Sequence, residues 1–144
     1  MKFLVAVDGS EAALRGALFG ARLASQLGER RVTLLYVRPS HAGAVVSLGA
    51  PGLLPEAKLE QEMDVVEREA LSEARAVVEE AGLEADERVD AGAAGPAICR
   101  VAGEGKFDLV VLGSRGHGEL KSLLVGSTSD AVVHGAPCSV LIVR

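Results

Sequence analysis

One segment of the chain, between residues 113 and 129, combines glycines, hydroxyl side chains and a cation. Glycines let backbone N–H groups converge on a phosphate without a Cβ in the way. A helix N-terminus adds unpaired N–H donors and a favourable dipole, and an arginine adds positive charge. The segment therefore has the parts of a cradle for a di- or triphosphate. The residues concerned are Gly113, Arg115, Gly116, Gly126, Ser127, Thr128 and Ser129.

The glycine spacing separates this segment from two common phosphate-binding loops. No Gly-Lys-Ser/Thr follows four variable residues, so the segment is not a Walker A loop. The dinucleotide fingerprint Gly-x-Gly-x-x-Gly is also absent, and the first apolar run leads into Asp8-Gly9-Ser10 instead. Because tight turns also use glycine, a purely structural turn stays open as the alternative.

A second candidate is Asp8, which ends the first apolar run. Ligands of open α/β sheets bind at the carboxyl ends of the strands, so this carboxylate could hold a base, a ribose or a metal-bound water. The alternative is a local role, in which Asp8 and Ser10 shape the turn and cap the helix that follows.

The elements that must position these residues follow from the apolar pattern. Four short apolar runs are continuous rather than alternating, which is typical of strands buried on both faces of a parallel sheet. A more polar fifth strand, Glu84–Val89, fits the edge of that sheet. The four apolar runs are Phe3–Val7, Val32–Val37, Leu109–Leu112 and Val140–Val143.

Helical patterns fill the intervals between the strands. Ser10 is a good N-cap and Gly28 a good C-terminal stop for the first helix. A long second helix spans about Pro55–Ala81, a short third helix starts near Pro96, and a fourth runs over about Ser127–His134. Strands and helices alternate throughout, so we expect one α/β domain over residues 1–144.

Composition excludes several classes of protein. The chain has 144 residues, a net charge of −5 and 3% aromatic residues, which argues against a nucleic-acid-binding domain. No apolar run approaches the roughly 18 residues of a membrane span. Cys99 and Cys138 lie far apart and outside any metal-binding motif, so we expect two reduced, mostly buried thiols and a cytoplasmic protein.

Two further segments bear on partners. The connection Arg38–Leu54 is longer than an ordinary loop and is either a lid, a partner contact or a tolerated insertion. The chain ends in the apolar strand Val140–Val143. An exposed apolar edge invites pairing, so we expect two-fold strand pairing in a homodimer, with burial inside one chain as the alternative.

Taken together, the motifs resemble the universal stress protein family. The stretch Leu4-Val5-Ala6-Val7-Asp8-Gly9-Ser10 resembles that family's start, and Gly113-x2-Gly116-x9-Gly126-Ser127 matches the pattern of its ATP-binding members at every fixed position. The segments Leu35-Tyr36-Val37 and Pro137–Val143 are similar too, so the resemblance covers essentially the whole chain.

This resemblance implies a Rossmann-like fold of the adenine nucleotide alpha hydrolase type. Its five parallel strands would lie in the order 3-2-1-4-5, with helices on both faces. Val7 and Asp8 would face the adenine and ribose, and Val37 the adenine. ATP with Mg²⁺ or Mn²⁺ would be the ligand, and dimers would form through the fifth strand. The residues around the ribose and phosphates would be Leu112, Gly113, Arg115, Gly116, Gly126, Ser127 and Thr128.

The sequence holds no obvious catalytic set and no dedicated metal-ligand cluster. His117 and Lys121 could contact a phosphate or could be ordinary solvated side chains. We therefore expect a nucleotide-binding module that acts in stress response or signalling through an unknown downstream partner. A slow ATP hydrolase or adenylate-handling enzyme is one alternative, and a nucleotide-free dimeric interaction module is the other.

Overall fold

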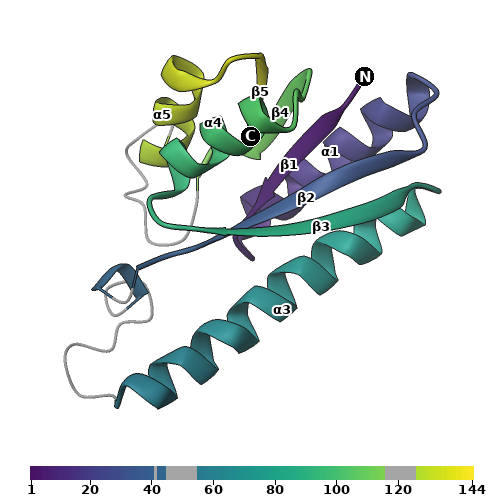
Figure 1. Cartoon of the computed structure of the whole chain (residues 1–144). Coiled ribbons are helices and arrows are strands. Elements are labelled where there is room, and N and C mark those ends of the chain that lie inside the picture. The colour runs from purple at the N-terminus through teal and green to yellow at the C-terminus, as the bar shows by residue number, and fades with distance from the viewer. Residues whose placement is uncertain (41, 45–54, 116–125) are drawn as a thin grey trace.

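A five-stranded parallel sheet forms the centre of the molecule, in a computed structural model that describes residues 1–40, 42–44, 55–115 and 126–144. Its order is β3-β2-β1-β4-β5, and every neighbouring pair is parallel (Figure 1). This confirms the predicted α/β fold and strand order. The strands are β1 (Phe3–Val7), β2 (Arg31–Arg38), β3 (Glu84–Ala91), β4 (Leu109–Gly113) and β5 (Ser139–Val143).

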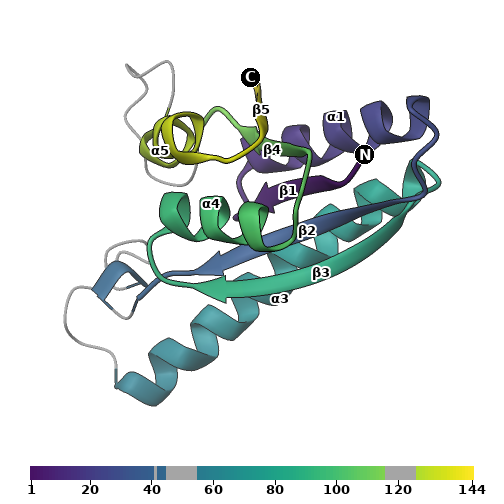
Figure 2. The same ribbon diagram turned by 45° about the horizontal axis from the view of Figure 1, so that its top comes forward.

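Helices cover both faces of this sheet (Figures 1 and 2). On one face, α1 (Glu11–Gln26) and α3 (Glu56–Glu80) close a core with the inward side chains of the strands. On the other face, α4 (Ala94–Glu104) and α5 (Ser127–Gly135) close a second core. Strands β1 and β4 therefore have apolar neighbours on both sides, which explains why their apolar runs do not alternate.

The ends of α1 follow the predicted signals. The Ser10 hydroxyl accepts a hydrogen bond from the Ala13 N–H at 3.1 Å, which satisfies one of the free donors of the first turn. Gly28 follows the last turn with φ of +78°, a left-handed conformation that suits glycine at this position. Helix α4 begins two residues before Pro96, which lies in its first turn, where a missing N–H costs nothing.

The two edges of the sheet differ in character. β3 runs two residues beyond the predicted Val89 because it pairs with β2 along its whole length. Five of its eight residues are charged and form exposed ion pairs with neighbouring elements, as Arg31 does with Glu84. In contrast, β5 has no charged residue and its apolar side chains are only half-buried. Charged side chains protect an edge from pairing with another chain, so β5 is the unprotected edge.

The two cysteines are half-buried and free rather than mostly buried as predicted. Burial raises the pKa of both thiols, so neither has the character of a reactive thiolate. Among the helices that the structure describes, none is long and apolar enough to cross a membrane.

Candidate functional site

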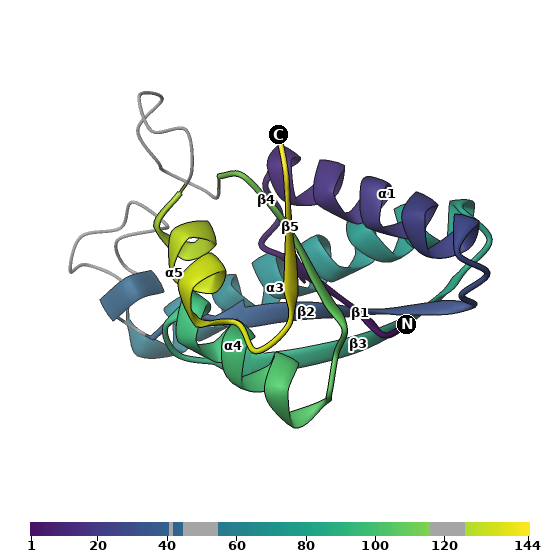
Figure 3. The ribbon, with the colours of Figure 1, turned by 90° about the horizontal axis from the view of Figure 1, so that it is seen from above.

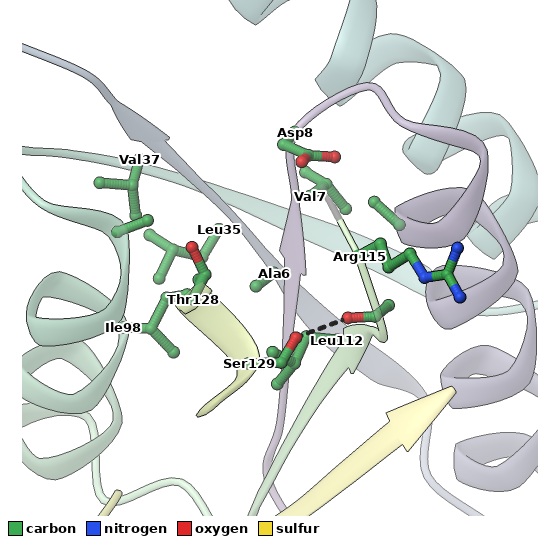
Figure 4. Close-up of a pocket in the computed structure, with 13 residues that line it drawn as sticks. Ala6, Val7, Asp8, Leu35, Val37, Ile98, Leu112, Arg115, Thr128 and Ser129 are labelled. Carbon is green, nitrogen blue, oxygen red and sulfur yellow. Dashed lines mark hydrogen bonds between the residues drawn. The ribbon is translucent and has the colours of Figure 1, made fainter. Parts of the chain in front are cut away.

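A pocket opens at the carboxyl ends of the central strands, where β1 lies between β2 and β4 (Figure 4). The chain leaves β1 toward β2 but returns later to its other side as β4, so the loops after β1 and β4 diverge and leave a crevice. The pocket holds about 530 Å³ of empty space, open solvent at its mouth included. Its lining residues are Ala6, Val7, Asp8, Ala13, Leu35, Val37, Ala94, Ile98, Leu112, Gly113, Arg115, Thr128 and Ser129.

One wall of the pocket is apolar. β2 contributes Leu35 and Val37, which are two residues apart and therefore share a face of the strand. Ile98 of α4 lines the same region, and Ala6 of β1 lies beside Leu35 on the neighbouring strand. Such a wall offers a flat apolar group, an aromatic ring for example, contact without demanding hydrogen bonds.

Asp8 follows β1 at the polar side of the pocket. Its Oδ1 accepts a hydrogen bond from the Ser10 N–H at 2.9 Å, so the expected turn-forming role is real. Among the described residues, Oδ2 has no hydrogen-bond partner. The same carboxylate therefore shapes the turn with one oxygen and can accept a ligand hydrogen bond with the other.

Arg115 lies beyond Gly113 at the rim of the pocket. Its guanidinium forms no ion pair or hydrogen bond with any residue that the structure describes. Figure 4 shows Arg115 and Asp8 on the side of the pocket away from Val37. The apolar wall and the charged groups thus occupy different parts of one pocket.

The start of α5 forms a third side. The Ser129 hydroxyl donates a buried hydrogen bond to the Gly113 carbonyl oxygen at 2.9 Å, drawn as a dashed line in Figure 4. That bond ties the helix to the end of β4. Thr128 is half-buried, and its hydroxyl has no hydrogen-bond partner among the described residues. The N–H groups of the first helical turn have no acceptor within α5, so this end of the pocket favours an anion.

Two of the predicted glycines already have structural roles. A Cβ on Gly113 would come within 2.4 Å of the carbonyl carbon of Ala12, so this residue lets β4 pack against α1. The Gly126 N–H donates to the Ser114 carbonyl oxygen at 2.8 Å, which joins the two ends of the segment between them. That N–H is therefore occupied and is not a free donor for a phosphate.

The pocket gathers most of the predicted site residues. Gly126 and Ser127 lie at the start of α5 but are not among the described lining residues, and Gly116 lies outside the described residues. The same holds for His117, Lys121 and most of the connection Arg38–Leu54. The predicted residues that line the pocket are Val7, Asp8, Val37, Leu112, Gly113, Arg115, Thr128 and Ser129.

Five lining residues were not among the predicted site residues. The period of two along β2 could have added Leu35, since Val37 was already chosen. Packing between elements determines the others, and no local signal marks them. The five residues are Ala6, Ala13, Leu35, Ala94 and Ile98.

The arrangement suits a ligand that is apolar at one end and anionic at the other. The apolar wall can hold a ring, Asp8 can accept from a hydroxyl, and Arg115 with the start of α5 can hold negative charge. Within the described ranges, no group of three or more His, Cys, Asp or Glu side chains could hold a metal ion by itself.

The sequence model of the Universal stress protein family matches residues 1–144. The chain belongs to the universal stress protein family. It is 35% identical over 146 residues to a universal stress protein of Thermus aquaticus, with 98% of this chain and 96% of the relative covered. It is also 30% identical over 146 residues to Universal stress protein YxiE of Bacillus subtilis, covering 99% and 98%.

Solved universal stress proteins share this fold. UspA from Lactobacillus plantarum superposes with a TM-score of 0.79 at 24% identity, covering 100% of this chain and 97% of that one. A universal stress protein in complex with cAMP gives 0.72 at 24% identity, covering 100% and 97%. A universal stress protein of Archaeoglobus fulgidus in complex with dAMP gives 0.73 at 22% identity, covering 100% and 98%.

Proposed function

We propose that this universal stress protein binds an adenine nucleotide, specifically ATP with Mg²⁺ or Mn²⁺. The observation that carries the proposal is the divided pocket, with an apolar wall at Val37 and charged groups at Asp8 and Arg115. A nucleotide has the same division into a ring, a sugar and an anionic tail. Two solved family members of the same fold were captured with adenine nucleotides, cAMP and dAMP, which supports the same ligand class here.

In this proposal, each part of the pocket takes one part of the ligand. Val7 and Val37 contact the adenine, and Asp8 accepts from a ribose hydroxyl through Oδ2, which has no hydrogen-bond partner among the described residues. Arg115 and the first turn of α5, at Ser127 and Thr128, hold the phosphates together with Gly116. Gly126 lets the phosphates approach the start of α5 because it has no Cβ. Leu112 and Gly113 form the floor between them.

The divalent cation neutralises phosphate charge when it is bound. The residues present fit an ion carried in by the phosphates rather than held by a protein cage, since Mg²⁺ keeps several waters and needs few carboxylates. Asp8 is the carboxylate within the pocket lining, and its free oxygen could accept from a metal-bound water.

We further propose a cytoplasmic homodimer that pairs through Val140–Val143 and reports nucleotide state in stress signalling to a downstream partner. The β5 edge has no charged residue, whereas the opposite edge, β3, has five, and this difference supports pairing at β5. The whole sequence, residues 1–144, then acts as one domain in each subunit.

Titration calorimetry with ATP, ADP, AMP and adenosine in the presence of Mg²⁺ tests the ligand. We expect saturable binding of ATP and progressively weaker binding as phosphates are removed, because Arg115 and the helix dipole act on negative charge. Failure of every adenine nucleotide to bind would instead favour a nucleotide-free interaction module. Acid precipitation of the purified protein adds a second check, since the proposal expects an adenine nucleotide in the supernatant.

Incubation with ATP and Mg²⁺ separates a binding module from a slow ATP hydrolase or adenylate-handling enzyme. A binding module leaves ATP intact over many protein equivalents. Multiple turnover that is lost in Asp8→Ala would establish the enzyme instead.

A further inference from the structure

Two half-exposed apolar side chains flank the free edge of β5, one on each face of the sheet. Phe19 of α1 is 50% exposed and Val133 of α5 is 52% exposed. Single exposed apolar side chains are common, but apolar side chains grouped around an unprotected strand edge can form an interaction surface. Figure 3 looks onto that edge, with β5 between α1 and α5.

The packing of α1 places Phe19 on the β5 side of the helix. Gly16 and Gly20 of the same helix pack onto β4, where Gly16 meets the Gly113 N–H and Gly20 meets Val111. Leu18 lies on the opposite flank, in a groove beside α3. Successive residues of a helix are turned by about 100°, so Phe19 lies on the side of α1 that Gly16 turns toward β4. That side faces the sheet edge and is turned away from the α3 side, where Leu18 lies.

The packing of α5 places Val133 toward the same edge on the other face. Ala131 and Gly135 of this helix meet α4, at Gly95 and Cys99. Val132 is fully buried. Val133 is therefore turned away from α4, on the flank that overhangs β5.

The side chains of β5 connect these two residues to the strand. Leu141 and Val143 pack with the α1 face, whereas Val140 and Ile142 pack with the α4 and α5 face. All four are only half-buried. Each face thus carries two half-buried apolar side chains of β5 and one exposed apolar side chain of the flanking helix, and we call these six residues together the β5 border.

A second copy of this chain is the occupant that fits the β5 border. The border is apolar on both faces and uncharged along the strand, so two copies can meet there despite a net charge of −5 each. Antiparallel pairing of β5 with its symmetry mate requires a two-fold axis perpendicular to the sheet. Such an axis keeps each face on its own side, so α1 meets α1 and α5 meets α5.

We propose that Phe19 and Val133 are the two apolar anchors of the contact between subunits, one on each face of the continuous sheet. This inference rests on the proposed homodimer and deepens it. Strand pairing alone supplies hydrogen bonds and register, whereas the two helices supply the apolar area that a stable interface needs.

Sedimentation velocity over a range of protein concentrations tests the inference on four single variants. Phe19→Ser and Val133→Ser change the border, and each change acts twice in a symmetric dimer. Leu18→Ser and Val65→Ser are matched controls, since these side chains are 37% and 43% exposed and lie outside the border. Circular dichroism and thermal melting check that all four variants fold.

We expect the dimer dissociation constant to rise about tenfold or more in each border variant and to stay unchanged in the controls. A dimeric wild type whose dissociation constant does not change in Phe19→Ser or in Val133→Ser would overturn the inference while leaving the homodimer intact. A wild type that stays monomeric at the highest concentration would overturn the proposed homodimer and the anchors with it.

Discussion

The last residue of β4, Gly113, lies so close to the first turn of α1 that a Cβ on it would come within 2.4 Å of the carbonyl carbon of Ala12. Helix α1 also has a glycine at this contact, because a Cβ on Gly16 would lie 3.2 Å from the Gly113 nitrogen. This close approach sets β4 against the helix that follows Asp8. The two loops that border the pocket are therefore held at a fixed separation.

Substitution of Gly113 by alanine tests that contact. Backbone atoms on both sides cannot yield cheaply, so we expect Gly113→Ala to lower the free energy of unfolding by about 3 kcal/mol. Gly103→Ala is the control, because the nearest atom to its new Cβ is Pro137 Cγ at 3.5 Å. Alanine suits a helix better than glycine, so this control should be neutral or stabilising by up to about 1 kcal/mol. Equal changes in the free energy of unfolding by urea for Gly113→Ala and Gly103→Ala would contradict the close packing of Gly113 on α1.

Ser129 and Thr128 are adjacent on α5 but should respond differently to truncation. Ser129→Ala removes a buried hydrogen bond to the Gly113 carbonyl, at a cost of about 1–2 kcal/mol in unfolding free energy. Thr128→Ala removes a hydroxyl that has no partner among the described residues, so stability should change little while nucleotide affinity falls. Thermal melting and titration calorimetry on both variants measure the difference. A reversed pattern would show that the two hydroxyls have been assigned the wrong roles.

The sheet was largely predictable because buried strands carry a strong sequence signal. Runs such as Phe3–Val7 are apolar throughout, and Ser10 and Gly28 mark the ends of a helix by their own chemistry. The far end of β3 was missed because Asp90 and Ala91 look like loop, and only pairing with β2 makes them strand.

The site was predictable in part, for a related reason. Asp8 and Gly113 could be predicted because each directly follows a continuous apolar run in the sequence. Ile98 lines the pocket only because α4 packs beside the central strands, and its distance in sequence from Asp8 and Gly113 hides that. The sequence also could not distinguish the packing role of Gly113 from the predicted approach of a phosphate, since both require the absence of a Cβ.

Asp8 combines a turn role and a proposed ligand role, and two substitutions separate them. Asp8→Asn keeps an oxygen that can accept from the Ser10 N–H, so stability should change by no more than about 0.5 kcal/mol. Loss of the charge should still weaken ATP binding by about tenfold, as for a charged hydrogen bond. Asp8→Ala should lose both affinity and stability. Unchanged ATP affinity in Asp8→Asn would remove this carboxylate from the site.

Arg38 ends β2 beside the pocket wall and anchors α3 to the sheet. Its guanidinium pairs with the Asp64 carboxylate, and its nitrogens lie 3.6 Å from the Oε2 atoms of Glu60 and Glu67. The Glu67 Oε2 is buried and has no hydrogen bond. Arg38→Met leaves that oxygen without its cation, so we expect a loss of about 1–2 kcal/mol in chemical unfolding.

Arg31→Met is the matched control for Arg38. Arg31 also pairs with two carboxylates, on Glu84 and Asp86, but its side chain is 62% exposed against 26% for Arg38. Exposed pairs are screened by water and salt, so this variant should lose about 0.5 kcal/mol or less. Similar losses in the two variants would mean that the Arg38 cluster is ordinary surface pairing.

The most direct test of the nucleotide proposal is the affinity for ATP with Mg²⁺ of Gly126→Asp, compared with Gly126→Asn. Gly126 has φ of −75° and caps α5, a place where both substitutes are favoured residues, so both variants should fold. They differ in one negative charge at the helix start that is proposed to face the phosphates. We expect Gly126→Asp to weaken ATP binding at least about tenfold more than Gly126→Asn does. Equal affinities for ATP in the Asp and Asn variants would contradict it.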